Sequence, residues 1–170
     1  MKEEQHHCPY RIGNGYDIHR IEEGLPMWLC GIQVESSFGF VAHSDGDVAI
    51  HALCDAILGA LALGDIGLHF PDTSEEWKGV KSVSLLSKVV SLASEKGWKV
   101  GNADITIALQ KPKIAKYILQ MRSVLSETMG IAEDCVSVKA TTGEKLGFVG
   151  RSEGCQAWAS VILCKPDAGL

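Results

Sequence analysis

Three polar side chains in the N-terminal third of the chain have the types and spacing that metal binding needs. Asp17 and His19 are two residues apart, so on a strand both project from one face while Ile18 points to the other. His51 lies further along, on a predicted helix. A carboxylate with neutral imidazoles suits Zn²⁺, Mn²⁺ or Fe²⁺. The sequence therefore predicts a site for zinc or another divalent transition metal at Asp17, His19 and His51.

The predicted helix that carries His51 is apolar on every side but one. Asp47, His51 and Asp55 recur every four residues and so form a single polar stripe. Burying these groups costs several kcal/mol unless each has a partner, and a metal ion is one such partner. In the alternative, Asp47 caps the helix, His51 bonds to a backbone carbonyl and Asp55 pairs with an arginine. We favour the cap for Asp47 and keep both alternatives open for His51 and Asp55.

Two further polar groups lie where an anion would bind. His43 and Ser44 stand just before this helix, where free backbone N–H groups attract phosphate. They are candidates for a direct contact with a substrate phosphate. The alternative is a surface histidine beside a serine that caps the helix, which would explain Ser44 but not His43.

A Gly-rich loop near the C-terminal end is a second place where phosphate groups would fit. Thr142, Glu144 and Lys145 follow a predicted strand and lead into this loop. Glu144 offers a hard oxygen ligand for Mg²⁺, while Lys145 and Arg151 would balance phosphate charge. Neither the P-loop spacing nor the glycine pattern of dinucleotide-binding proteins is present. A plain surface turn with charged side chains is the alternative.

Composition and charge limit the classes of protein to consider. The 170 residues fit one domain, with 46% hydrophobic and 22% charged residues. The net charge of -5 and the lack of a basic stripe argue against nucleic acid as a partner. The most apolar stretch, 48–63, is shorter than the roughly 20 residues of a membrane span, so no membrane partner is expected. The six cysteines show no Cys-x-x-Cys pair, and we expect reduced thiols in an intracellular protein rather than three disulfides.

The pattern of apolar residues and turn signals predicts an α+β fold. We expect a disordered tail over 1–9 and a single domain over 10–166. The predicted architecture is a small mixed β-sheet with helices packed on one face, plus a β-hairpin. The expected strands are 10–20 and 27–34, paired as the hairpin, then 103–109, 135–140 and 157–163. The expected helices run from near Ser44 to Gly64, over 83–96 and over 112–129, and 65–78 is expected to be an irregular loop.

Several ordered motifs resemble one enzyme family. They are Arg-Ile-Gly-Asn-Gly-Tyr-Asp-Ile-His from Arg11, Ala-His-Ser-Asp-Gly-Asp-Val-Ala-Ile-His from Ala42, Gly-Asp-Ile-Gly from Gly64, and the segments 70–73, 110–113, 138–142 and 144–148. Together they resemble the 2-C-methyl-D-erythritol 2,4-cyclodiphosphate synthase family over nearly everything after the tail. Two departures are Gly143, where the family often has threonine, and Leu68-His69, which occupy a variable place.

The resemblance implies a lyase of the MEP pathway, the non-mevalonate route to isoprenoids. Such an enzyme converts the 4-cytidine-diphosphate derivative of 2-C-methyl-D-erythritol 2-phosphate into 2-C-methyl-D-erythritol 2,4-cyclodiphosphate and releases CMP. The resemblance also implies a homotrimer with active sites between subunits, the cytidine pocket coming from one chain and zinc from the next. Phe148 and Arg151 would line the central cavity of that trimer, where an isoprenoid diphosphate would fit.

The same resemblance assigns roles to the candidate residues. Asp17, His19 and His51 would bind zinc, and Glu144 would bind a Mg²⁺ or Mn²⁺ ion that bridges the nucleotide phosphates. His43 and Thr142 would be catalytic, with Thr142 stabilising phosphate in the transition state. The expected substrate contacts are Asp17, His19, His43, Ser44, Asp65, Ile66, Gly67, Phe70, Asp72, Thr73, Lys113, Thr141, Thr142, Glu144, Phe148 and Arg151, with Asp65 and Gly67 on the methylerythritol and Lys113 on the cytidylate.

Two other functions fit part of the pattern. A metallo-phosphohydrolase would use the same ligands to activate a water and would give a ring-opened monophosphate. An isoprenoid-diphosphate binding protein would use the cavity near Phe148 and Arg151 and would release no CMP. The short tail favours the bacterial cytoplasm as the location, with a plastid-type organelle as the alternative in a eukaryote.

Overall fold

The computed structural model describes residues 8–71, 74, 77 and 79–166, so the expected tail over 1–9 lies outside it apart from its last two positions. The frame is a five-stranded sheet in the order β4–β1–β7–β5–β6. Its strands are β1 (Tyr10–Glu23), β4 (Phe38–Phe40), β5 (Lys99–Ala108), β6 (Val136–Thr141) and β7 (Gly154–Cys164). β5 and β6 pair in parallel and the other neighbours are antiparallel, so the sheet is mixed.

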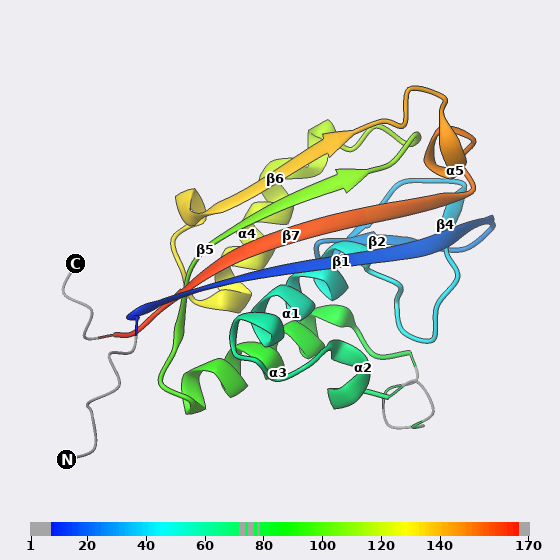
Figure 1. The fold of residues 1–170 in the computed structure, drawn as a ribbon. Coiled ribbons are helices and arrows are strands. Elements are labelled where there is room, and N and C mark those ends of the chain that lie inside the picture. The colour runs from blue at the N-terminus through cyan, green and yellow to red at the C-terminus, as the bar shows by residue number, and fades with distance from the viewer. Residues whose placement is uncertain (1–7, 72–73, 75–76, 78, 167–170) are drawn as a thin grey trace, which may run out of the picture.

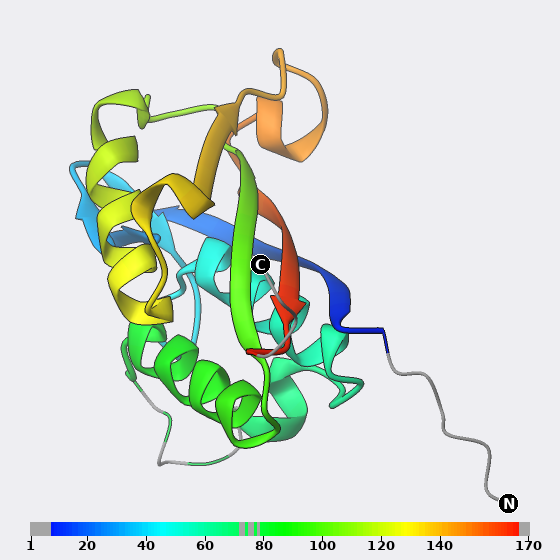
Figure 2. The ribbon, with the colours of Figure 1, turned by 90° about the vertical axis from the view of Figure 1, so that its left-hand side faces the viewer.

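Three helices cover one face of this sheet (Figures 1 and 2). They are α1 (Val48–Ala60), α3 (Ser82–Glu95) and α4 (Ile118–Met129). Side chains along β7 alternate as a half-buried strand should, with Ala157, Ala159 and Val161 buried while Trp158 and Ser160 are exposed on the other face. The apolar face of the sheet and the helices share one hydrophobic core. The predicted α+β class, with helices on one face of a mixed sheet, is confirmed.

Helix α1 and strand β1 approach each other main chain to main chain. A Cβ atom added to Gly15 would lie 1.9 Å from the carbonyl oxygen of Ala52. A Cβ atom added to Gly13 would lie 1.8 Å from the carbonyl oxygen of Ala56, one turn further along the helix. Only glycine allows this approach, because any side chain at these positions would collide with the helix backbone. The contact brings His51, which is next to Ala52, against the part of β1 that carries Asp17.

The predicted hairpin between 10–20 and 27–34 is wrong. β1 pairs with β4 and β7 instead, and 27–34 folds on itself into a separate two-stranded sheet. The two short strands are β2 (Met27–Leu29) and β3 (Ile32–Val34). The turn between them places Cys30 at φ 50° and Gly31 at φ 81°, as a two-residue hairpin turn requires. A cysteine in this conformation gives no turn signal in a sequence, which is why the region resembled one continuous strand.

The first long helix begins later than expected. It starts at Val48 and not near Ser44, because the side chain of Asp47 caps it by accepting the N–H of Ile50. It ends at Ala60, although the Gly64 stop signal lies four residues further on. The cap predicted for Asp47 is confirmed.

Two other segments differ from their predicted structure. The helix expected from 112 begins at Ile118, after a 3-10 turn, η2 (Ala115–Tyr117), because proline is favoured in turns as well as at helix starts. Within the expected loop 65–78, α2 (Ile66–His69) forms a single helical turn. The remaining short elements are η3 (Glu133–Cys135) and α5 (Gly147–Gly150). Within the described ranges, no helix has the length and apolar character needed to cross a membrane.

Candidate functional site

The structure brings Asp17, His19 and His51 together where β1 meets α1. Their ligand atoms all lie within 4.8 Å of one another. Asp17 Oδ2 is 3.3 Å from His19 Nδ1 and 3.1 Å from His51 Nδ1. Among the described residues, no other group of three or more His, Cys, Asp or Glu side chains is this compact. The predicted meeting of these three side chains is confirmed.

Strand alternation supplies two of the three groups, as the spacing predicted. Asp17 and His19 lie on the helix-covered face of β1, and Ile18 between them is exposed on the other face. β7 holds this part of β1 in register, with Asp17 opposite Ala157 and His19 opposite Cys155. The pair therefore sits on a rigid strand in the body of the sheet.

The pKa values of the two histidines shift in opposite directions. Burial lowers the pKa of His19, although the negative charge of Asp17 opposes this. Burial acts in the same direction on His51, but the hydrogen bond and charge of Asp17 outweigh it and raise the pKa of His51. His19 Nδ1 lies 2.7 Å from the carbonyl oxygen of Ile18, which can only accept. His19 Nδ1 therefore carries a proton, and the lone pair of the neutral ring is on Nε2.

The donor set fits a zinc-type ion. One carboxylate and two imidazoles match the three-ligand sets that leave a further coordination position for substrate or water. The side chains of His19, His51 and Asp17 are only 14%, 12% and 24% exposed, so leaving them without a partner would be costly. When bound, such an ion would supply positive charge and Lewis acidity to a phosphate oxygen.

An open cavity of about 530 Å³ lies beside this cluster. His43 and Ser44 reach it from the loop before α1, and the wall formed by Phe70 and Trp77 is aromatic, with ring centroids 5.1 Å apart. A mainly apolar cavity with a few convergent polar groups is typical of a small-molecule site. The predicted contacts that line it are His19, His43, Ser44, Ile66, Gly67 and Phe70.

Two aspartates that the sequence placed near this site support the fold around it. Asp65 Oδ1 accepts the N–H of Leu68 at 3.0 Å and caps α2. Asp55 Oδ1 accepts the N–H of Ile66 at 2.7 Å, so neither the metal nor the arginine alternative is correct for Asp55. Burial raises the pKa of Asp55, opposed by that hydrogen bond. Both carboxylates fix α2 where it forms part of the cavity wall.

Asp47 is the most enclosed carboxylate near the site. It is fully buried, and besides the N–H of Ile50 it accepts those of Cys30 at 2.9 Å and Gly31 at 2.7 Å. Burial raises its pKa even though these three donors favour the charged form. Asp47 therefore joins the β2–β3 turn to the start of α1.

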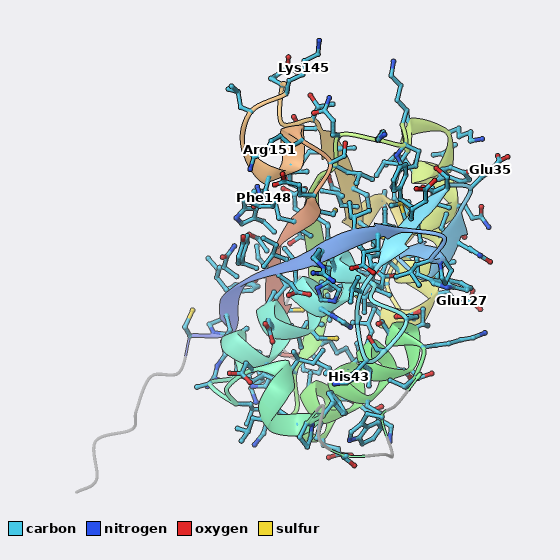
Figure 3. The ribbon with its side chains drawn as sticks, turned by 90° about the vertical axis from the view of Figure 1, so that its right-hand side faces the viewer. Glu35, His43, Glu127, Lys145, Phe148 and Arg151 are labelled. Atoms are coloured by element: carbon cyan, nitrogen blue, oxygen red, sulfur yellow. The ribbon has the colours of Figure 1, made fainter. Side chains whose placement is uncertain are left out.

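The C-terminal candidate residues gather elsewhere. Thr141, Thr142 and Phe148 line a separate hollow beside β7 that shares no residue with the first cavity. Thr142 Oγ1 donates to Glu144 Oε1 at 2.8 Å, and Arg151 forms two hydrogen bonds with Glu153. Figure 3 shows Lys145 and Arg151 toward the top of the molecule and His43 toward the bottom, with Phe148 below Arg151. Within one chain, the structure does not bring the two halves of the predicted site together.

Three expected substrate contacts remain, namely Lys113, Asp72 and Thr73. Lys113 is exposed and lines neither cavity. Asp72 and Thr73 lie outside the described residues.

Sequence patterns did not predict the groups that contact the far side of the His51 ring. Ser82 Oγ lies 3.0 Å from His51 Nε2 and donates to Asp45 Oδ1 at 2.5 Å. Ser44 Oγ is 3.3 Å from the same nitrogen. The alternative in which His51 bonds a backbone carbonyl is therefore wrong. Ser82 is 31 residues from His51, and no local pattern relates the two positions.

Comparison with known proteins agrees with this geometry. The YgbB family model matches residues 10–164. A relative from Cytophaga hutchinsonii, named 2-C-methyl-D-erythritol 2,4-cyclodiphosphate synthase, is 53% identical over 92% of this chain and 98% of its own length. A solved structure of 2C-methyl-D-erythritol-2,4-cyclodiphosphate synthase in a CDP-bound form is 41% identical, with a TM-score of 0.84 over 90% of this chain and 99% of that chain.

The bifunctional IspDF from Campylobacter jejuni has a similar fold in part of its length. It is 43% identical, with a TM-score of 0.88 over 92% of this chain, which spans only 42% of that protein. A family model that matches nearly all described residues, together with a relative above half identity over almost its full length, establishes the relationship. This chain belongs to the YgbB family.

Proposed function

We propose that this chain cyclises the 4-cytidine-diphosphate derivative of 2-C-methyl-D-erythritol 2-phosphate to 2-C-methyl-D-erythritol 2,4-cyclodiphosphate and CMP, in the MEP pathway. The observation that carries the proposal is the Asp17, His19 and His51 cluster beside a small-molecule cavity, in a chain 53% identical to a synthase of that name. The CDP bound to a relative supports a cytidine diphosphate ligand.

The reaction closes a ring within one substrate. An oxygen of the 2-phosphate forms a bond to the β-phosphorus of the diphosphate. The bond from that phosphorus to the bridging oxygen breaks, and CMP leaves with its electron pair. No covalent enzyme intermediate is needed, so the protein's task is to hold two phosphates in line and to balance their charge.

The residues of the first cavity would hold the methylerythritol end. Ile66, Gly67 and Phe70 would supply the wall, and His43 and Ser44 would face the phosphate. A backbone hydrogen bond holds the loop that carries His43, because the carbonyl oxygen of His43 accepts the N–H of Gly79 at 2.8 Å. Zinc at Asp17, His19 and His51 is the ion that this donor set favours.

The residues of the second hollow would hold the nucleotide end. Glu144 would bind the Mg²⁺ or Mn²⁺ on the nucleotide phosphates, and Thr142, bonded to Glu144, would contact the reacting phosphate. Lys113 would serve the cytidylate. Because the two hollows share no lining residue within one chain, we infer that a second copy completes the site.

A homotrimer with sites between subunits supplies that second copy. The outer face of the sheet supports it, because it exposes large apolar side chains that a monomer would leave in water, among them Ile12 at 77% and Ile162 at 40%. Tyr16 and Trp158 lie on the same face with ring centroids 5.5 Å apart. An isoprenoid diphosphate near Phe148 in the central cavity would compete with Glu153 for Arg151.

A bacterial cytoplasm is the compartment we propose. All six cysteines, each within the described residues, are free thiols, and Cys30, Cys54 and Cys155 are buried. Free thiols persist in a reducing compartment, where disulfides are rare.

Product analysis tests the function. The purified chain is incubated with the cytidine-diphosphate substrate, with and without a chelator, and products are identified by phosphorus NMR. Cyclic diphosphate and CMP, lost on chelation, are expected. A ring-opened monophosphate would instead identify a phosphohydrolase. Binding of an isoprenoid diphosphate without CMP release would identify a binding protein.

A further inference from the structure

The two ring nitrogens of His51 face different partners. Nδ1 points to the metal cluster, 3.1 Å from Asp17 Oδ2. Nε2 points away from it and lies 3.0 Å from Ser82 Oγ. Ser82 is the first residue of α3 and is fully buried, so water does not replace this contact. The far side of the ring thus meets the Ser82 hydroxyl group, with Ser44 Oγ farther away at 3.3 Å.

Asp45 determines which way that hydroxyl group points. Its Oδ1 is 2.5 Å from Ser82 Oγ, and its Oδ2 accepts the backbone N–H of Ser82 at 2.9 Å. A carboxylate can only accept, so the Ser82 hydroxyl donates to Asp45. The Ser82 oxygen then has only lone pairs to offer His51, so Nε2 donates to Ser82. Nδ1 faces the Asp17 carboxylate, which also can only accept, so the proton on Nδ1 is the one that a bound metal ion would replace.

The loop that carries Asp45 is fixed by its own backbone. Asp45 N–H donates to the carbonyl oxygen of Val80 at 3.2 Å, and Gly79 N–H donates to that of His43 at 2.8 Å. Asp45 Oδ1 also lies 3.3 Å from the backbone N–H of Asp47, the cap of α1. The carboxylate therefore joins the starts of α1 and α3 and has a defined orientation toward Ser82.

We propose that Asp45 and Ser82 are positioning residues for His51: they hold a proton on Nε2 and so reserve Nδ1, beside Asp17, for a divalent transition metal. The inference rests on the metal site in the proposed function. A hydrogen bond to the nitrogen that does not bind metal fixes the tautomer and angle of a histidine ligand. Here the link is a serine placed between carboxylate and imidazole.

Ser82→Ala removes the hydroxyl group that connects Asp45 to His51 and leaves the backbone unchanged. The backbone N–H of residue 82 still bonds Asp45, so the start of α3 keeps that partner. We expect the dissociation constant for Zn²⁺, measured by competition with a chelating dye, to rise between about 10-fold and 100-fold. Ser126→Ala is the matched control, since it also removes a buried hydroxyl near a helix, one that donates to the carbonyl oxygen of Ser123. Its Zn²⁺ affinity should equal that of the unmodified protein.

Asp45→Asn should reverse the link rather than remove it. The N–H of Ser82, at 2.9 Å, is the closer of the two backbone donors that face this side chain, so the amide oxygen should face it rather than the N–H of Asp47 at 3.3 Å. This turns the amide NH₂ toward Ser82 Oγ. Ser82 would then donate to His51 Nε2 and leave the proton on Nδ1, where the metal should bind. Zn²⁺ should bind at least as weakly as in Ser82→Ala, although the side chain keeps its shape.

A spectroscopic measurement separates positioning from general damage. The Co²⁺-loaded full chain should show an exchangeable imidazole N–H resonance from His51 that Ser126→Ala preserves and Ser82→Ala loses to fast exchange with water. Ser82→Thr, which keeps a hydroxyl group, should restore both the resonance and the Zn²⁺ affinity. Melting temperatures of the metal-free variants identify any that are misfolded, and comparisons are made among those that melt within a few degrees of one another.

The outcomes are distinct. Unchanged Zn²⁺ affinity in both Ser82→Ala and Asp45→Asn would overturn the proposal, as would an His51 N–H resonance that survives in Ser82→Ala. CMP release is measured separately. If the unmodified protein releases no CMP but the variants bind Zn²⁺ as expected, the proposed function fails and the positioning role stands. If the unmodified protein releases CMP normally but the variants bind Zn²⁺ as tightly as it does, the proposed function stands and the positioning role fails.

Discussion

The two polar regions of this molecule are built in different ways. The metal ligands are held by long-range packing, because β1 and α1 meet through their main chains and bring Asp17 Oδ2 within 3.1 Å of His51 Nδ1 across 34 positions of sequence. The Gly-rich loop is held by local contacts, in which Thr142 bonds Glu144 and Arg151 pairs with Glu153.

This difference indicates that the two regions have different roles. Groups fixed by the sheet and a buried helix have little freedom, which suits a site that must hold an ion and one end of a substrate accurately. A loop held by its own side chains would be able to adjust if, as proposed, a second chain and a nucleotide bind there. The predictions below test whether one region acts through rigidity and the other through contacts across an interface.

Removal of a metal ligand should have the largest effect. His51→Ala takes one imidazole from the three-ligand cluster, and we expect CMP release to fall by roughly 1,000-fold or more because the ion is no longer held. Activity is measured as CMP release and metal content by elemental analysis. A well-folded His51→Ala protein that lacks zinc and turns over normally would exclude this cluster as the active site.

Mixing two inactive variants should restore activity if the site lies between subunits. His51→Ala damages only the metal region and Thr142→Ala only the loop region. When equal amounts are unfolded together and refolded into mixed trimers, roughly a quarter of the sites combine two intact regions, so about a quarter of normal activity should return. No recovery, with mixed trimers shown by mass spectrometry, would place both regions of a site on the same chain.

A change in the loop should affect turnover but not metal binding. Thr142→Val removes the hydroxyl group that donates to Glu144 Oε1 and accepts the N–H of Glu144, whose φ is 49°. We expect kcat to fall roughly 100-fold while Zn²⁺ affinity stays the same. Thr142→Ser keeps the hydroxyl group and is the control. Weaker Zn²⁺ binding in Thr142→Val would show that the two regions are coupled within one chain.

A methyl group at the strand–helix contact should disturb the metal region through packing. A Cβ atom on Gly15 would lie 1.9 Å from Ala52 O, so Gly15→Ala should lower the free energy of unfolding by about 2–3 kcal/mol and weaken Zn²⁺ binding as α1 moves away. Gly59→Ala is the control, because the nearest atom to its Cβ would be 3.9 Å away. Urea unfolding should show Gly59→Ala to be unchanged or up to about 1 kcal/mol more stable.

The difference between local contacts and long-range packing also explains which features could be predicted from the sequence. Asp17 and His19 follow from the period of a strand, and the stripe through His51 follows from the period of a helix, so local patterns were enough to name the cluster. The contact of Ser82 with His51 was not predictable, because it joins the start of α3 to α1 through tertiary packing alone. The β2–β3 hairpin was missed because Cys30 adopts a positive φ that its residue type does not signal.

Asp55 shows a further limit of pattern reasoning. Its place on the polar stripe was correct, but helical spacing cannot show whether a carboxylate faces a metal or a backbone N–H group, and here it accepts that of Ile66. The separation of the two candidate regions was also beyond local patterns. Only the resemblance, which implies a homotrimer, predicted a site shared between chains.

The smallest effect is expected at a surface pair next to the loop region. Lys139 Nζ lies 2.6 Å and 2.5 Å from the two carboxylate oxygens of Asp104, on the parallel strands β6 and β5. The hydrogen bond to Lys139 lowers the pKa of Asp104. Because the folded pKa is below the unfolded one, the pair stabilises the fold above about pH 4, the unfolded pKa, and the contribution is lost as pH falls through that range.

Asp104→Asn should therefore lower the free energy of unfolding at pH 7 by less than about 1 kcal/mol, since both side chains are about half exposed and solvent screens their charges. The difference from the unmodified protein should be smaller at pH 3 than at pH 7, and smaller in high salt. Urea unfolding at the two pH values measures it. β6 leads directly into Thr141 and Thr142, so a loss above 1 kcal/mol, or any loss of CMP release, would mean that the loop depends on long-range support from the sheet. The loop would then resemble the metal region more closely than its local contacts indicate.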